Sequence, residues 1–105
     1  MRRGEIRWYR FKPPDKMRPV LILTRESVLE FFAEVTIAPI TTRIRAIPSE
    51  VLLDRQDGLA QPCAVNLDHV KTVPKARIGR VITTLSGLRM AEVRSALLFA
   101  LGFDR

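Results

Sequence analysis

The sequence is poor in the residues that build cross-links and metal sites. It contains one cysteine, Cys63, and one histidine, His69, among 105 residues. One cysteine cannot form an internal disulfide, and a structural zinc site needs four cysteine or histidine ligands. We therefore expect no disulfide, no metal and no other cofactor. Cys63 lies on a predicted strand and is interpreted as a small buried residue.

Long apolar runs are also absent. No run reaches the ~18 residues that a membrane-spanning helix needs. The N-terminus, Met1 to Glu5, begins basic but leads into alternating residues rather than the apolar segment of a signal peptide. We therefore expect a cytoplasmic protein with no membrane partner. Its length and its 47% hydrophobic residues predict one globular domain over residues 1–105.

Acidic residues are scarce relative to basic ones. The chain has 18 Lys and Arg against 11 Asp and Glu, a net charge of +7. Residues 1–25 carry eight of the basic and two of the acidic residues, so they hold most of the excess. Such an uneven distribution is typical of a surface that binds a polyanion, most often nucleic acid. A generic basic surface, or a patch for an acidic protein, would give the same balance.

The most regular apolar stretch runs from Arg18 to Thr24 and reads RPVLILT. Its β-branched residues predict a strand, and the lack of polar alternation predicts that both faces are covered. Pro19 is expected at the start of this strand, because proline cannot donate to a ladder. Arg18 would then lie where the chain leaves the core. From this stretch alone, an exposed arginine ending a strand is the simpler interpretation.

The remaining pattern predicts a small, mainly antiparallel β protein with one C-terminal helix. Further strands are predicted at Glu5–Phe11, Glu34–Thr41, Ser49–Leu53, Pro62–Leu67 and Arg77–Ile82. Residues 25–32 could form a short helical turn or a loop. Ser86 and Gly102 are expected to cap a helix whose apolar residues face the sheet or a second subunit. The expected fold class is a curved sheet or open barrel.

Six ordered blocks resemble the MazF/PemK toxin family. They are Arg3–Ile6, Arg18–Leu23, Val35–Thr41, Gly58-Leu59, Leu67–Val73 and Leu97–Phe103. The resemblance covers nearly the whole chain. It implies an SH3-like open barrel of the MazF/CcdB plasmid-maintenance-toxin type, and a homodimer. It also implies a sequence-specific endoribonuclease, or mRNA interferase, that is held in check by a cognate antitoxin.

The resemblance also implies which residues cleave RNA. The family uses an arginine before the proline of the second strand and a threonine that ends the third, which here are Arg18 and Thr41. A glutamine that contacts RNA in the family is replaced by His69. Histidine has an unperturbed pKa of ~6.5, which suits acid–base catalysis. His69 therefore either contacts a base, as the glutamine does, or takes part in proton transfer.

Metal-free RNA cleavage uses the neighbouring 2′-hydroxyl as its nucleophile and leaves a cyclic phosphate and a 5′-hydroxyl. The protein must stabilise charge on the phosphate and move two protons. Arg18 suits the first task, because a guanidinium is planar, permanently charged and a bidentate donor to phosphate. Thr41 can donate its hydroxyl to a phosphate oxygen.

Basic and polar residues on the predicted loops beside this pair should bind the RNA phosphates. They are Lys12, Lys16, Thr42, Arg43 and Arg45. Trp8, Tyr9 and Phe11 are candidates for stacking on bases, although Trp8 is expected in the core. The loop from Lys12 to Met17 is shorter than in the family, so the recognised RNA sequence cannot be carried over.

Two alternatives to the nuclease remain open at this point. One is a CcdB-like toxin that acts by binding gyrase, and the other is a catalytically inactive RNA-binding homologue. The pair of Arg18 and Thr41 with a basic rim favours RNA. The antitoxin is expected to cover the Arg18 rim with an acidic segment.

Overall fold

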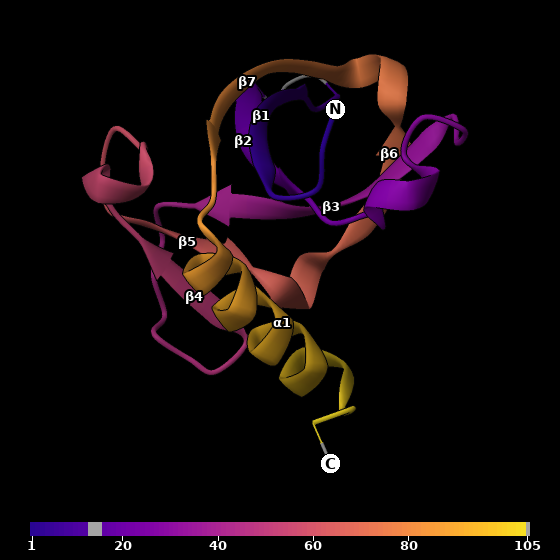
Figure 1. Cartoon of the computed structure of the whole chain (residues 1–105). Helices are drawn as coiled ribbons and strands as arrows, with labels where there is room; N and C mark the ends of the chain where they lie inside the picture. The colour runs from indigo at the N-terminus through magenta and orange to yellow at the C-terminus, as the bar shows by residue number, and fades with distance from the viewer. Residues whose placement is uncertain (13–15, 105) are drawn as a thin grey trace.

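The protein is a curved antiparallel sheet with one long helix packed against part of it. The computed structural model describes residues 1–12 and 16–104. Over these residues the strands are β1 (Glu5–Arg10), β2 (Met17–Ile22), β3 (Glu34–Thr41), β4 (Glu50–Leu53), β5 (Cys63–Asn66), β6 (Lys71–Pro74) and β7 (Ile78–Thr84), followed by helix α1 (Gly87–Leu101). Figure 1 shows β1 and β2 curling against β7, with α1 beside β4. The predicted fold class is confirmed.

The strand order is β4-β5-β3-β2-β1-β7, and β6 pairs with β3 outside this path. β2 lies between β1 and β3, as its unbroken apolar pattern predicted. Its alternating side chains enter two different cores. Leu21 packs in the cluster beneath α1, together with Val93, whereas Val20 and Ile22 pack in the cluster inside the curl of the sheet.

Pro19 lies inside β2 rather than at its start, so the predicted boundary was two residues late. β2 begins at Met17, and Pro19 pairs with Trp8 on β1. The ladder between β2 and β3 starts only at Val20. At Pro19 the strand is therefore paired on one side, where a proline that lacks its N–H is tolerated. This end of β2, with Arg18, is left open on the β3 side.

β3 matches its predicted bounds and changes partner along its length. Residues Glu34–Ile37 pair with β6, and Ile40 and Thr41 pair with β5. Pro39 falls in the gap between these two partners, so its missing donor costs no ladder bond there. The change of partner brings the end of β3 beside β5 and carries Thr41 away from β6.

The C-terminal helix begins and ends where the capping residues predicted. Ser86 Oγ accepts the Arg89 N–H at 3.1 Å, and Gly102 adopts a left-handed conformation with φ 78°. The apolar face that was predicted to meet the sheet or a second subunit is covered by the sheet only in part. Val93 and Ala96 are buried, whereas Leu88 and Leu101 are 76% and 55% exposed. None of the helices in the described residues is long and apolar enough to cross a bilayer.

Candidate active site

A cavity of about 250 Å³ opens at the uncovered end of β2. Strands β1, β2, β3, β5 and β7 and the loop before β5 surround it. The residues that line it are Trp8, Arg18, Pro19, Ile40, Thr41, Thr42, Leu59, Ala60, Gln61, Cys63 and Ile82. Among the described residues, no group of three or more His, Cys, Asp or Glu side chains is placed to hold a metal ion. We name this cavity the Arg18 pocket.

Sheet register explains why Arg18 and Thr41 meet in this pocket. β2 and β3 pair Val20 with Pro39, and the same register continued by two residues brings Arg18 level with Thr41. The ladder itself stops before this point, so the two side chains border an opening rather than a paired strand. The predicted catalytic pair is therefore brought together by the structure.

Both side chains of the pair are placed to donate hydrogen bonds. Arg18 is exposed, and within the described residues its guanidinium makes no hydrogen bond or ion pair with a protein group. Thr41 Oγ1 accepts the Arg43 N–H at 3.0 Å, which fixes the oxygen and leaves the hydroxyl hydrogen for another acceptor. An anion at this point would receive a planar bidentate donor and a hydroxyl donor.

Trp8 lies in the pocket wall, so the expectation that it belongs to the core was wrong. Ile6, on the same face of β1, is fully buried, whereas Trp8 is only partly buried and lines the cavity. Trp8 pairs with Pro19, one residue from Arg18. The sequence pattern of β1 did not predict this position, because the exposure of Trp8 to the pocket depends on where β3 stops covering β2.

Gln61 was not singled out from the sequence, yet it lines the pocket on the loop between β4 and β5. This loop is held in place at its base. Asp57 accepts the Nε of Arg89 at 2.9 Å and a terminal nitrogen at 3.1 Å, and its carbonyl accepts the Thr83 hydroxyl at 2.9 Å. The Arg89 hydrogen bonds hold the pKa of Asp57 below its usual value. The wall that carries Gln61 is therefore fixed to α1 and β7.

The predicted RNA-binding residues fall into three groups. Thr42 lines the pocket and Arg43 is exposed just beyond it. Arg45 is engaged elsewhere, since its Nε donates to the buried Glu50 carboxylate at 2.9 Å. Lys12 and Lys16 are exposed on either side of residues 13–15. Of the loop predicted from Lys12 to Met17, residues 13–15 lie outside the described residues, and Met17 already belongs to β2.

His69 does not line the Arg18 pocket. It ends a short 3₁₀ helix, Leu67–His69, that follows β5. Its side chain is exposed, and its Nδ1 lies 3.2 Å from the Asn66 Nδ2. Acid–base catalysis requires a group close to the reacting atoms. The pocket does not by itself bring His69 that close.

The fold and the pocket together define a small β protein that gathers a guanidinium, hydroxyl groups and an aromatic side chain around one cavity. A family model described as "PemK-like, MazF-like toxin of type II toxin-antitoxin system" matches residues 2–101. The chain belongs to this family, as the six sequence blocks predicted.

Individual relatives agree with the family match. The chain is 46% identical over 88 residues to endoribonuclease MazF3 of Mycobacterium tuberculosis, covering 84% of this chain and 82% of the relative. It is 36% identical over 98 residues to the probable endoribonuclease MazF2 of the same organism, covering 92% and 94%. These names support the nuclease prediction and give no support to the gyrase-binding alternative.

Solved structures show the same fold. The M. tuberculosis toxin MazF-mt6 superposes with a TM-score of 0.88 at 39% identity, covering 96% of this chain and 99% of that one. A mycobacterial endoribonuclease in complex with its cognate antitoxin superposes with a TM-score of 0.86 at 26% identity, covering 97% and 95%.

Proposed function

We propose that this chain is a MazF-type endoribonuclease, an mRNA interferase that cleaves single-stranded RNA at specific sequences without a metal ion. The observation that carries the proposal is the Arg18 pocket. There a guanidinium with no protein partner among the described residues stands level with Thr41 across β2 and β3. The names of the relatives, which are endoribonucleases, support the same activity.

The reaction needs no covalent bond to the protein. The 2′-oxygen attacks the adjacent phosphorus, the bond to the 5′-oxygen breaks, and the products are a cyclic phosphate and a 5′-hydroxyl. Arg18 donates to the non-bridging oxygens, where negative charge accumulates in the transition state. Thr41 donates its hydroxyl to the same phosphate, with its oxygen held by the Arg43 N–H. Together they position the phosphate and stabilise its charge.

Among the described residues that line the pocket there is no histidine or carboxylate to transfer the protons. His69 remains our hypothesis for this role, and it can reach the reacting atoms only if the RNA bends from the pocket toward the 3₁₀ helix after β5. Its other proposed role, a contact to an RNA base, requires only that the strand passes over this helix.

The phosphates on either side of the cut should follow the basic rim of the pocket. We assign this role to Lys12, Lys16, Thr42 and Arg43, which are exposed or line the pocket. Arg45 would contribute mainly through the field of its charge, because Glu50 and Asp68 hold its guanidinium. Such contacts give affinity that falls with salt.

The partner that controls the activity is proposed to be a cognate antitoxin in the cytoplasm. Solved structures of relatives include a mycobacterial endoribonuclease in complex with its cognate antitoxin and MazE-MazF of Deinococcus radiodurans. The net charge of +7 and the exposed Arg18 favour an acidic antitoxin segment that covers the pocket rim. Such a segment would block the phosphate site directly.

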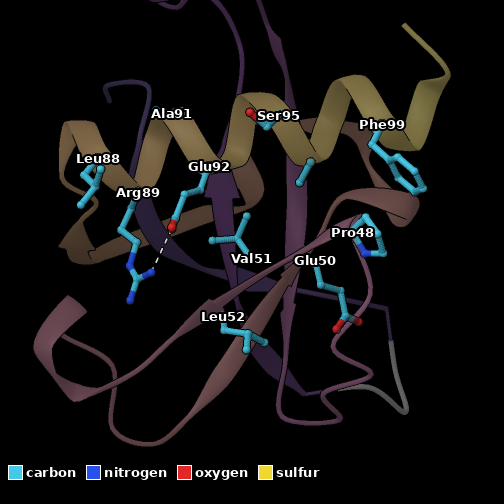
Figure 2. A pocket seen from close by; sticks show the side chains of 11 residues that line it. Pro48, Glu50, Val51, Leu52, Leu88, Arg89, Ala91, Glu92, Ser95 and Phe99 are labelled. Atoms are coloured by element: carbon cyan, nitrogen blue, oxygen red, sulfur yellow. Dashed lines mark hydrogen bonds and ion pairs between the residues drawn. The ribbon is translucent and has the colours of Figure 1, made fainter. Parts of the chain in front are cut away.

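We also propose that residues 1–105 act as one domain that forms a homodimer through the groove between α1 and β4. Figure 2 shows this groove, with Leu88 and Phe99 projecting from the helix and Leu52 from the strand below. Arg89 and Glu92 lie in the same groove. A surface that carries apolar groups and both signs of charge can complement a second copy of itself about a two-fold axis.

The direct test incubates the purified protein with a long single-stranded RNA in EDTA. Cleavage that leaves a cyclic phosphate and a 5′-hydroxyl is expected. Arg18→Ala should lower kcat by about 10²–10³-fold, because a transition-state donor is lost. Arg25→Ala, an exposed arginine outside the pocket, is the matched control and should cleave normally. RNA binding without cleavage would favour the inactive homologue.

A further inference from the structure

We propose that Trp8 and Gln61 form a recognition site for one unstacked RNA base beside the phosphate held by Arg18. Trp8 stacks on the face of the base and Gln61 reads its hydrogen-bonding edge. This assignment rests on the proposed nuclease function and adds to it a source of sequence preference. Neither Trp8 nor Gln61 has a role in the proposed chemistry at the phosphate.

The size and lining of the Arg18 pocket fit one base. Its volume, about 250 Å³, lies below the ~300–1,000 Å³ of pockets that hold drug-sized ligands. Beyond Arg18, the walls include the apolar side chains of Pro19, Ile40, Leu59 and Ile82. A phosphate needs no apolar wall, whereas a base that leaves its stack does. The pocket therefore extends from the phosphate site into a space suited to a planar ring.

Two irregularities in the ladder between β1 and β7 aim side chains into this space. Arg7 pairs with Val81 and Tyr9 with Ile78, so Trp8 alone faces both Gly79 and Arg80. One step earlier, Ile6 pairs with Thr83, which leaves Ile82 as an extra residue. Bulges of this kind bend a strand and redirect side chains, and they recur beside active sites. Here both Trp8 and the extra Ile82 line the pocket.

Close backbone packing supports Trp8 from behind. A Cβ placed on Gly79 would lie 3.2 Å from the Trp8 carbonyl oxygen and 3.4 Å from its Cβ, so β7 approaches Trp8 closely because residue 79 is glycine. Arg7 donates to the Gly79 carbonyl at 2.9 Å and holds the two strands at this point. The backbone that carries Trp8 is therefore fixed, which lowers the entropy cost when a base stacks on the indole ring.

Gln61 offers the complementary polar contact. Its side chain is exposed at the pocket, and within the described residues its amide makes no hydrogen bond to a protein group. A glutamine amide carries two donors and an acceptor and can bind a base edge with a donor and an acceptor at once. The Asp57–Arg89 pair and Gly58 fix the loop that carries it. A fixed amide discriminates between bases better than a mobile one.

The first experiment compares the bases at the cut sites in a long RNA, read by sequencing the new 5′ ends. Gln61→Glu replaces the amide donors by acceptors without changing the length of the side chain. We expect the base preference at one position beside the cut to change, while cleavage still depends on Arg18. Gln56→Glu makes the same chemical change in the same loop outside the pocket, and should leave the preference as in the wild type. Unchanged base frequencies in an active Gln61→Glu would overturn the site.

The second experiment does not depend on cleavage. Trp8 is the single tryptophan of the chain, so its fluorescence reports on this position alone. We expect quenching by short 2′-deoxy oligonucleotides, with affinities that differ among adenine, cytosine, guanine and uracil sequences. Trp8→Leu should raise the dissociation constant of the tightest-binding oligonucleotide on the order of ten- to hundred-fold. Fluorescence polarisation of a labelled strand measures this constant.

The two experiments separate the site from the reaction. Base-dependent quenching by a protein that cuts no RNA would reject the nuclease and leave the recognition site standing. Cleavage that needs Arg18, with Trp8 fluorescence that no oligonucleotide changes, would reject the recognition site alone. Equal affinity for all four sequences would also reject it.

Discussion

The Asn66 amide holds the His69 ring in one tautomer. Asn66 Oδ1 accepts the Asp68 N–H at 3.0 Å, so its Nδ2 is the atom that faces His69 Nδ1 at 3.2 Å. An amide nitrogen can only donate, and Nδ1 must therefore accept. The ring N–H is then on Nε2, on an exposed side chain. His69 thus presents a donor to a ligand, as a glutamine amide would.

The geometry of this ring predicts the outcome of His69→Gln. If His69 contacts a base through its Nε2–H, the variant should cleave within about threefold of the wild-type kcat, because a new amide supplies the same kind of donor. The pH dependence of kcat should also be unchanged. Both are measured on a short fluorogenic RNA between pH 5 and 9. A fall of 10²-fold or more, or a profile that loses one limb, would instead assign proton transfer to His69.

At the scale of single residues, sequence reasoning predicted that Arg18 and Thr41 lie together, but it predicted neither that Trp8 lines their pocket nor that Gln61 does. Arg18 and Thr41 lie in recognisable blocks, one before a proline and one at a strand end. Trp8 reads as core because it alternates with the buried Ile6. Its place in the pocket depends on the β1–β7 bulges and on where the β2–β3 ladder stops. Those are register properties that no local pattern encodes.

The turn that carries Gln61 depends on a glycine. Gly58 ends a 3₁₀ helix with φ 95°, and a Cβ there would lie 2.7 Å from the Thr83 Cβ and closer still to its hydroxyl. Gly58→Ala should therefore lower the free energy of unfolding by about 2–5 kcal/mol, from backbone strain and overpacking. Gly87→Ala, where the new Cβ meets no atom within 4 Å, is the control and should be neutral or slightly stabilising. Urea denaturation measures both. Equal stability of the two variants would contradict the packing argument.

The ion pair at the base of the same loop makes stability depend on pH. Asp57 is mostly buried and receives two hydrogen bonds from Arg89, so Asp57→Asn should cost about 1–3 kcal/mol at pH 7. The folded-state pKa of Asp57 is lowered, chiefly by Arg89. A lowered pKa stabilises the fold above the unfolded value of about 4, and the gain is lost as pH falls through the folded value.

Urea unfolding at pH 7 and at pH 3 tests this linkage. The difference in the free energy of unfolding between the wild type and Asp57→Asn should be largest at pH 7 and should shrink at pH 3. Glu92→Gln removes the exposed partner of the same Arg89, and should cost less than about 0.5 kcal/mol at either pH. A wild-type advantage that persists undiminished at pH 3 would show that the Asp57 charge is not the source.

Elements with a strong pattern were predicted well, and those with a weak pattern were not. β3 and the caps of α1 lie where expected, because alternation and capping residues mark them. β6 was missed, since only Val73 of its four residues is buried and only Val70 separates it from a 3₁₀ turn. Its strand character comes from pairing with β3 rather than from its own residues.

At the scale of the whole molecule, the groove between α1 and β4 leaves apolar side chains uncovered beside the core residues Val51 and Ala96. The groove between α1 and β4 has a volume of about 710 Å³, and Leu88, Phe99 and Leu52 are 76%, 47% and 47% exposed there. The sequence predicted an apolar helix face and left open whether the sheet or a second subunit covers it. The sheet takes only Val93, Ala96 and their neighbours. The remaining side chains are those that the proposed homodimer would bury.

Two phenylalanines near the end of the chain can distinguish dimerisation through the groove from a general effect of removing exposed apolar side chains. Phe99 lines the groove, whereas Phe103 is 71% exposed beyond the end of α1 and does not line it. Phe99→Asp should raise the dimer dissociation constant on the order of 10²-fold, because a buried interface anchor is replaced by a charge. Phe103→Asp should dimerise as the wild type does. Sedimentation equilibrium over a range of concentrations measures both constants, and an unchanged melting temperature shows that each variant is folded. A fully dimeric Phe99→Asp would place the second copy elsewhere, whereas dissociation of both variants would mean that the interface extends past the groove to the C-terminus.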